Sequence, residues 1–165
     1  MHNIRGIMAV YNNEDENFEK AFKYILKAEG GYICHKNDRG GATNLGITQN
    51  TYNTFRQRKK LAPHSVSLLT KDEAKQIYYE NYWCLSGADR ISDFAAALVL
   101  FDSCVNHGVA TGKALYKNSG GNVELFLKLR RNKYENIVKR CPSQKVFYKG
   151  WMNRIKRLEE YIKTI

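Results

Sequence analysis

The sequence predicts an α+β protein that is predominantly α-helical, with one small β-rich hairpin region after the first helix. Three observations support this fold class. Apolar residues recur at three- and four-residue spacing through most of the chain, which is the period of an amphipathic helix. Residues 31–47 interrupt that pattern with a dense group of turn-forming glycine, asparagine and aspartate. The composition is that of a folded protein, with 43% hydrophobic and 26% charged residues among 165.

The first helix is predicted to begin at Glu16 and to end at the glycine pair 30–31, because glycine is a common helix C-terminal signal. Its apolar stripe consists of Phe18, Ala21, Phe22, Ile25 and Leu26. Residues 31–47 are expected to form turns and short strands. Thr48 is a suitable N-cap for a second helix that runs to about residue 58.

Two further helices are predicted in the middle of the chain. Thr70 and Glu73 have the spacing of a capping box and open a helix that runs toward Trp83. Residues 89–93 form a connector. Residues 94–105 are apolar nearly all round, which predicts a buried central helix.

The last third of the chain predicts two amphipathic helices. Residues 123–138 form the first of them, and the second follows Pro142. The apolar positions of the second are Trp151, Ile155, Leu158 and Ile162. Gly108 and Gly112 are interpreted as marking the end of the central helix, and residues 118–122 as a turn, so no helix is predicted between them.

Positive charge is concentrated in this last third. The whole chain carries 27 Lys and Arg against 16 Asp and Glu, a net charge of +11. Residues 1–111 hold 13 basic and 12 acidic residues, whereas residues 112–165 hold 14 basic and 4 acidic residues. Such a balance suits a polyanionic partner: nucleic acid, an anionic membrane surface or an acidic wall polymer. No apolar stretch approaches the roughly 20 residues that a membrane span needs.

The sequence gives no complete signature for a metal site, and no metal or cofactor is predicted. The four cysteines are widely spaced without a CxxC pair: Cys34, Cys84, Cys104 and Cys141. Cys104 with His107, and Cys34 with His35, could supply zinc ligands, but free thiols and ordinary histidines fit the pattern better. The N-terminus lacks a basic stretch followed by an apolar core. We therefore expect synthesis in the cytoplasm without a signal peptide.

Glu29 is the leading candidate for a catalytic residue. It ends an amphipathic helix, where the negative end of the helix dipole and apolar neighbours are expected to raise the pKa of a carboxyl. Asp38 follows in a polar turn, and the hydroxyl of Thr43 could hold a water molecule. A protonated Glu facing an ionised Asp suits glycoside hydrolysis. Residue types alone leave this open, because Glu at a helix end is usually solvated and Asp in a glycine-rich turn usually forms an Asx-turn.

Two segments of the sequence resemble a known protein family. Residues 29–32 (EGGY) and 38–48 (DRGGATNLGIT) closely resemble the opening motif of the glycoside hydrolase family 108 muramidases, peptidoglycan-cleaving lysozymes similar to phage endolysins. Further similar segments bring the likeness to about residues 17–160; they are residues 69–74, 77–78, 82–83, 101–102 with 105–108, and 150–151 with 154. The chain departs from the family at residues 111–124, which are short and basic where relatives often carry a longer peptidoglycan-binding-like segment.

The resemblance implies a lysozyme-like fold that hydrolyses the bond between N-acetylmuramic acid and N-acetylglucosamine. It implies Glu29 as the catalytic acid, and the order Glu29, Asp38, Thr43 resembles the triad of phage-type lysozymes, with one gap a residue shorter. Five residues are candidates for substrate binding: Tyr32, Asn44, Tyr82, Trp83 and Asn106. Tyr82 and Trp83 could stack on sugar rings, yet their helical spacing fits a core position equally well. Asn106 and His107 could line a cleft or serve the structure alone.

We expect one lysozyme-like domain over residues 1–165, with a catalytic region at 17–108 and a basic helical region at 109–165 that attracts an anionic bacterial envelope. The protein is expected to be a monomer that acts on the cell wall after release or export, without a nucleic-acid partner. Two alternatives stay open. One is a non-catalytic relative that binds the wall or assists secretion. The other is a nucleic-acid-binding module built on the basic helices, although these carry no recognition motif.

Overall fold

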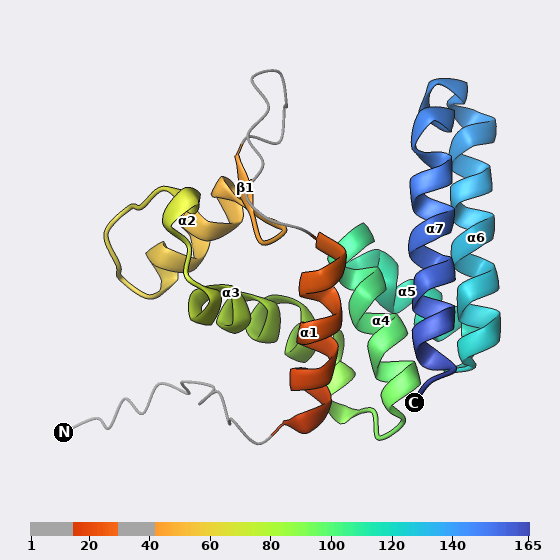
Figure 1. Cartoon of the computed structure of the whole chain (residues 1–165), viewed down its shortest axis with the longest axis horizontal. Helices are drawn as coiled ribbons and strands as arrows, with labels where there is room; N and C mark the ends of the chain where they lie inside the picture. The colour runs from red at the N-terminus through yellow and green to blue at the C-terminus, as the bar shows by residue number, and fades with distance from the viewer. Residues whose placement is uncertain (1–14, 30–41) are drawn as a thin grey trace. The chain divides into compact units, whose positions relative to one another are not determined.

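The computed structural model describes residues 15–29 and 42–165 (Figure 1). Contacts between Cα atoms divide the chain into two compact units, Met1–Asn81 and Tyr82–Ile165. The described part is mostly helical, and its only strands form one two-stranded antiparallel hairpin after the first helix. The fold class predicted from the sequence is therefore confirmed.

The first unit begins with helix α1 (Glu16–Glu29). The Asp15 carboxylate caps it by accepting a hydrogen bond from the backbone N–H of Phe18 at 2.9 Å. Four of the five residues of the predicted apolar stripe are buried: Phe18, Ala21, Phe22 and Ile25. The rings of Phe18 and Phe22 lie 4.9 Å from Tyr79 and 5.7 Å from Tyr78, so α1 packs against the helix that contains these tyrosines.

The rest of the first unit consists of short elements. Strands β1 (Thr43–Asn44) and β2 (Ile47–Thr48) precede helix α2 (Gln49–Arg58). A 3₁₀ turn, η1 (Val66–Leu68), leads to helix α3 (Lys71–Tyr78). The capping box predicted at the start of α3 is present in both directions between Thr70 and Glu73. The helix then continues as a π-helical turn, η2 (Tyr79–Cys84).

The second unit is built around helix α4 (Phe94–His107), after a 3₁₀ turn η3 (Ala88–Arg90). Every residue from Ala96 to Cys104 is buried, which confirms the predicted central helix. Helices α6 (Val123–Arg140) and α7 (Lys145–Ile162) lie side by side in Figure 1, joined by the 3₁₀ turn η4 (Pro142–Gln144). The rings of Tyr134 on α6 and Trp151 on α7 stack with centroids 4.7 Å apart.

Helix α5 (Val109–Ser119) was not predicted from the sequence. It packs on α4 and α6. Gly112 lies inside it, where a Cβ atom would meet the Cys104 backbone, with the amide nitrogen at 3.0 Å and Cα at 3.2 Å, and would also clash with the Cys104 thiol. This glycine therefore permits close helix packing, whereas the sequence pattern suggested a helix end. No helix in the described residues is long and apolar enough to span a membrane.

Candidate active site

Glu29 is the last residue of α1, as the sequence predicted. The helix that carries it is held firmly, because its buried stripe packs on the aromatic residues of α3 and η2, and Glu19 forms an ion pair with Lys75 of α3. Two other predicted site residues, Asp38 and Tyr32, lie outside the described residues. The structure resumes at residue 42, directly before the hairpin.

The hairpin places Thr43 and Asn44 on one strand. Thr43 pairs with Thr48 and Asn44 with Ile47 across the two antiparallel strands. The turn between them has positive φ at both central residues, 50° at Leu45 and 76° at Gly46, as a primed hairpin turn requires. Ile47 is buried and fixes the face that points inward, which leaves Thr43 half-buried.

The same hairpin is tied to its neighbours at both ends. The hydroxyl of Tyr78 donates a hydrogen bond to the Leu45 carbonyl at 2.9 Å. The Thr48 hydroxyl caps α2 by accepting from the Thr51 N–H at 3.2 Å, as predicted for this residue. The next side chain, Gln49, accepts from the Val66 N–H at 2.7 Å. These bonds fix the position of the strand that carries Thr43.

The side-chain amide of Asn44 forms hydrogen bonds within the first unit. Its Nδ2 group donates to the carbonyl of Val66 at 3.0 Å and to that of Ser67 at 3.4 Å. Asn44 therefore joins the hairpin to η1, and its carbonyl oxygen is the part of the amide that remains for a ligand.

A polar cluster joins α2 to the start of α3, and the sequence indicated only its capping box. The Tyr52 hydroxyl and the Arg56 guanidinium each donate to the Glu73 carboxylate at 2.9 Å. Burial raises the pKa of Glu73, but hydrogen bonds from Thr70 and Tyr52 and the Arg56 charge outweigh it, so the net pKa of this carboxyl is lowered. Glu73 is therefore ionised at neutral pH, and the cluster fixes α2 against the start of α3.

Tyr82 and Trp83 stand in η2 and occupy different environments. Tyr82 is half-buried, whereas Trp83 is 1% exposed. The Trp83 ring packs edge-to-face on Phe101 of α4 with centroids 5.3 Å apart. Of the two roles that its helical spacing allowed, Trp83 takes the core position in this structure, and its ring is not exposed as a platform for a sugar.

The second unit contains a buried ionic cluster that no sequence motif indicates. The Asp102 carboxylate is fully buried on α4, where it accepts from Arg130 Nη1 of α6 at 2.5 Å and from Arg154 Nη2 of α7 at 2.8 Å. Burial raises the pKa of Asp102, but the charges and hydrogen bonds of the two arginines outweigh it and hold the pKa below its ordinary value. In the sequence, the one hint of this cluster is the Asp102 carboxylate within a mainly apolar helix.

Asn106 is oriented by this cluster. Its side-chain oxygen accepts from Arg130 Nη2 at 3.3 Å and from the Tyr134 hydroxyl. Because a guanidinium can only donate, the amide atom that faces Arg130 must be the oxygen. The Nδ2 donors therefore point away from the cluster, and the residue is exposed. Asn106 presents a pre-oriented amide donor on the surface of the second unit.

His107, the last residue of α4, lies beside the same cluster with its ring 5.0 Å from that of Tyr134. Its Nε2 atom is buried and has no hydrogen-bond partner among the described residues. Burial and the nearby charges of Arg130 and Lys133 lower the pKa of His107 to about 3. The imidazole is therefore neutral at neutral pH.

This histidine predicts a specific acid sensitivity. The folded-state pKa of about 3 is below the ordinary value of 6.5, so the unfolded chain takes up the proton first and stability is lost as the pH falls below about 6.5. We expect His107→Phe, which keeps a ring against Tyr134, to reduce the stability lost between pH 7 and pH 4 by on the order of 2 kcal/mol, since solvent screens a half-buried ring. Urea unfolding at several pH values measures this. Equal pH dependence in both proteins would contradict the assignment.

The described cysteines Cys84, Cys104 and Cys141 are free thiols. Burial raises the pKa of Cys104 to about 12, so this thiol is protonated and unsuited to metal binding as it stands. Within residues 15–29 and 42–165, no group of three or more His, Cys, Asp or Glu side chains could hold a metal ion. Cys34 and His35, the other candidates for zinc ligands, lie outside the described residues.

Comparisons with known proteins agree with this architecture. The family model described as glycosyl hydrolase 108 matches residues 22–108, which include Glu29, Asp38 and Thr43. Among solved structures, the chain is similar to SagA of Brucella abortus, with 28% sequence identity, a TM-score of 0.72, and coverage of 89% of this chain and 94% of that chain. This likeness supports the lysozyme-like α+β fold. No curated protein sequence matches the chain significantly.

The matched segment is more than half of the chain. It contains the end of α1, the hairpin, α2, α3, η2 and α4, and these elements hold six of the eight predicted site residues. The chain therefore belongs to the glycosyl hydrolase 108 family and is a glycoside hydrolase that acts on peptidoglycan.

Proposed function

We propose that the protein is a muramidase that hydrolyses the bond between N-acetylmuramic acid and N-acetylglucosamine, with Glu29 as the general acid. The observation that carries this proposal is the position of Glu29 as the last residue of a firmly anchored helix, inside the segment that the family model matches. The last carbonyl groups of a helix have no partner within it and form the negative end of its dipole. A carboxyl group at such a helix end is expected to keep its proton more readily, which a general acid that works near neutral pH requires.

In the proposed reaction, Glu29 donates its proton to the glycosidic oxygen as the bond to the anomeric carbon breaks. Asp38, assisted by Thr43, positions a water molecule or stabilises the positive charge that develops on the sugar ring. The hairpin supports this role of Thr43, because Asn44 of the same strand is bonded to η1, and η1 is bonded in turn to Gln49 of α2. A carboxylate separation of roughly 5–5.5 Å would favour retention at the anomeric carbon and roughly 6.5–9.5 Å inversion.

Substrate binding in this proposal uses exposed polar groups. Asn106 supports it best, because its outward Nδ2 group can donate to the carbonyl oxygen of an N-acetyl substituent and the buried cluster fixes its direction. Asn44 can accept a hydrogen bond through its oxygen, since its nitrogen is used within the first unit. Tyr82 is half-buried and remains a candidate for stacking, as does Tyr32.

The products of digestion test the bond that is proposed. Purified peptidoglycan is treated with the enzyme, and the soluble fragments are analysed by mass spectrometry. A muramidase yields fragments with muramic acid at the reducing end. Reducing-end N-acetylglucosamine would place the cut at the other glycosidic bond, and an anhydro-muramic end would show that no water enters the product. Absence of soluble fragments would favour a non-catalytic wall-binding protein. Each of these three results contradicts the proposal.

We further propose that the basic helices bring the enzyme to an anionic envelope. Residues 112–165 carry a net charge of +10, from 14 basic and 4 acidic residues. Several of the basic side chains on α6 and α7 are exposed, including Lys128, Lys145, Lys149 and Arg157. A summed positive field of this kind raises the local concentration near a polyanion and weakens as salt is added.

Replacing these four side chains together by Gln is expected to weaken sedimentation of the enzyme with intact cell walls several-fold at low salt, and to flatten the salt dependence of that binding. Cleavage of a small soluble substrate should stay within about twofold of the wild-type rate, because that reaction does not need the surface field. Loss of soluble-substrate cleavage in a variant with unchanged thermal stability would contradict this separation of roles.

A further inference from the structure

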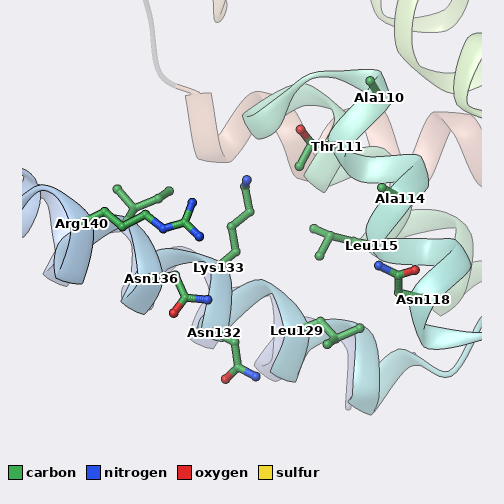
Figure 2. Close-up of a pocket in the computed structure, with 11 residues that line it drawn as sticks. Ala110, Thr111, Ala114, Leu115, Asn118, Leu129, Asn132, Lys133, Asn136 and Arg140 are labelled. Atoms are coloured by element: carbon green, nitrogen blue, oxygen red, sulfur yellow. The ribbon is translucent and has the colours of Figure 1, made fainter.

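A groove between α5 and α6 is not used by the proposed reaction. The two helices diverge from the glycine turn at residues 120–121 and line an open groove of about 740 Å³ (Figure 2). Figure 2 shows Lys133 extending from α6 toward α5, where Thr111 faces it, and Arg140 reaching into the open end. Asn118 and Asn136 contribute side-chain amides from the two helices. All of these residues belong to the second unit.

The polar groups of this groove have no partners of their own. Within residues 15–29 and 42–165, the side chains of Thr111, Asn118, Lys133, Asn136 and Arg140 make no hydrogen bond or ion pair. Other basic residues of the same two helices are paired, for example Arg131 with Glu159. The lining of the groove contains no carboxylate. Two cations and several amides are therefore free to receive a ligand that brings negative charge.

The remaining lining is aliphatic rather than aromatic. Leu115, Leu129 and Ile137 are half-buried along the groove, together with two alanines. Sugar rings are usually held by aromatic side chains, and this lining contains none. A nucleic acid strand needs a continuous basic track with stacking platforms, which two cations in an aliphatic groove do not provide. Small aliphatic surfaces beside amide groups suit a peptide instead, because each amide can pair with both the N–H and the C=O of a peptide bond.

The spacing of the two cations on α6 constrains the length of the ligand. Lys133 and Arg140 are seven residues apart on α6, so their attachment points are separated by roughly 10 Å along the helix axis. About three residues of extended peptide span that distance. Two cations attached at this spacing suit a short peptide that carries more than one free carboxylate.

From the charge, the unpaired amides and the aliphatic lining, we infer that the α5–α6 groove binds a short anionic peptide. The identification of its natural source rests on the proposed function: on peptidoglycan, this ligand is the stem peptide attached to the muramic acid residues. The groove would then favour glycan strands that still carry peptides, and it would act on affinity for the substrate rather than on bond cleavage.

The binding experiment uses the full chain with Glu29→Gln, so that no substrate is consumed. Isothermal titration calorimetry compares the tripeptide L-alanyl-γ-D-glutamyl-diaminopimelate with the same tripeptide in which the carboxylates are amidated. We expect the free tripeptide to bind at least about tenfold more tightly than the amidated form, since hydrogen bonds to charged groups are the stronger ones.

Three variants locate the site, one of them a control. Lys133→Gln should weaken binding of the free tripeptide about tenfold and remove most of its advantage over the amidated form. Lys139→Gln is the matched control, because it removes the same charge from an exposed position of α6 that does not line the groove; it should change affinity less than about twofold. Arg140→Gln, at an exposed position, gives a second test that does not depend on the half-buried Lys133.

Equal weakening by Lys133→Gln and Lys139→Gln would show that only the general field attracts the peptide, and would overturn the inference. So would competition by a peptide-free disaccharide of N-acetylmuramic acid and N-acetylglucosamine, since the groove would then be a sugar subsite. Cleavage of peptide-free glycan strands by the wild-type chain is measured in parallel. If cleavage fails while the tripeptide still binds, the proposed function falls and the groove assignment stands; the reverse result overturns the groove alone.

Discussion

Replacement of Glu29 by Gln is expected to slow the release of soluble fragments from peptidoglycan by about 10³-fold, because a positioned general acid contributes roughly 10²–10⁴ to such a rate. The amide has nearly the same shape as the carboxyl group but cannot deliver a proton to the glycosidic oxygen. Glu29 is the last residue of α1, and the helix is anchored by residues on its preceding turns, so the fold should be unaffected. Fragment release from purified walls at several pH values provides the measurement.

Glu16→Gln is the matched control, since it makes the same chemical change at the opposite, exposed end of α1. Its activity should equal that of the wild type. The wild-type rate should also fall as the pH rises and the acid loses its proton, and this limb should be missing from the residual activity of Glu29→Gln. A Glu29→Gln protein with wild-type thermal stability and a wild-type rate would remove Glu29 from the mechanism.

The substitution Asp102→Asn is expected to lower the free energy of unfolding by about 3–5 kcal/mol, the range found when one partner of a buried ion pair is removed. Asp102 and Arg130 are both 0% exposed, so the loss of the carboxylate leaves a buried guanidinium without its counter-charge. Arg130 Nε already has no partner among the described residues, which leaves this side chain little compensation. Urea unfolding followed by circular dichroism measures the change.

Asp89→Asn is a suitable control, because the ion pair of Asp89 is with the exposed Arg90 at the surface of the same unit. It should change stability by less than about 1 kcal/mol. The double substitution Asp102→Leu with Arg130→Met should recover part of the loss, since apolar groups of similar size can replace a buried pair. If Asp102→Asn were as stable as the Asp89 variant, the cluster would not hold α4, α6 and α7 together as described.

The helices that the sequence predicted best are those with a clear signal at one end or at both ends. In α1, Glu16 and the glycine pair bracket a regular apolar stripe, and in α3 the capping box defines the first turn. Helix α5 was missed because its Gly112 is a packing contact with α4, and a local pattern cannot distinguish a glycine that ends a helix from one that lets another helix approach. The π-helical turn at residues 79–84 likewise has no simple sequence signal.

The candidate site, too, was predictable from the sequence only in part. The position of Glu29 at a helix end followed from local signals, and its chemical role was suggested by the resemblance to known muramidases. The environments of Trp83 and Asn44 did not follow, because an aromatic residue or an amide serves equally well in a core and at a ligand. Which of these applies depends on contacts with Phe101 in one case and with the backbone of η1 in the other, and such contacts between distant parts of the chain are not encoded locally.

Gly112 also has a consequence for the evolution of this protein. Its missing side chain determines how near α5 can come to α4, and α5 forms one wall of the groove. A single added methyl group would push that wall outward without altering any residue that lines the groove. Natural variation at this inner position could therefore adjust the size of ligand that the protein accepts, and a comparison restricted to the lining residues would overlook the cause.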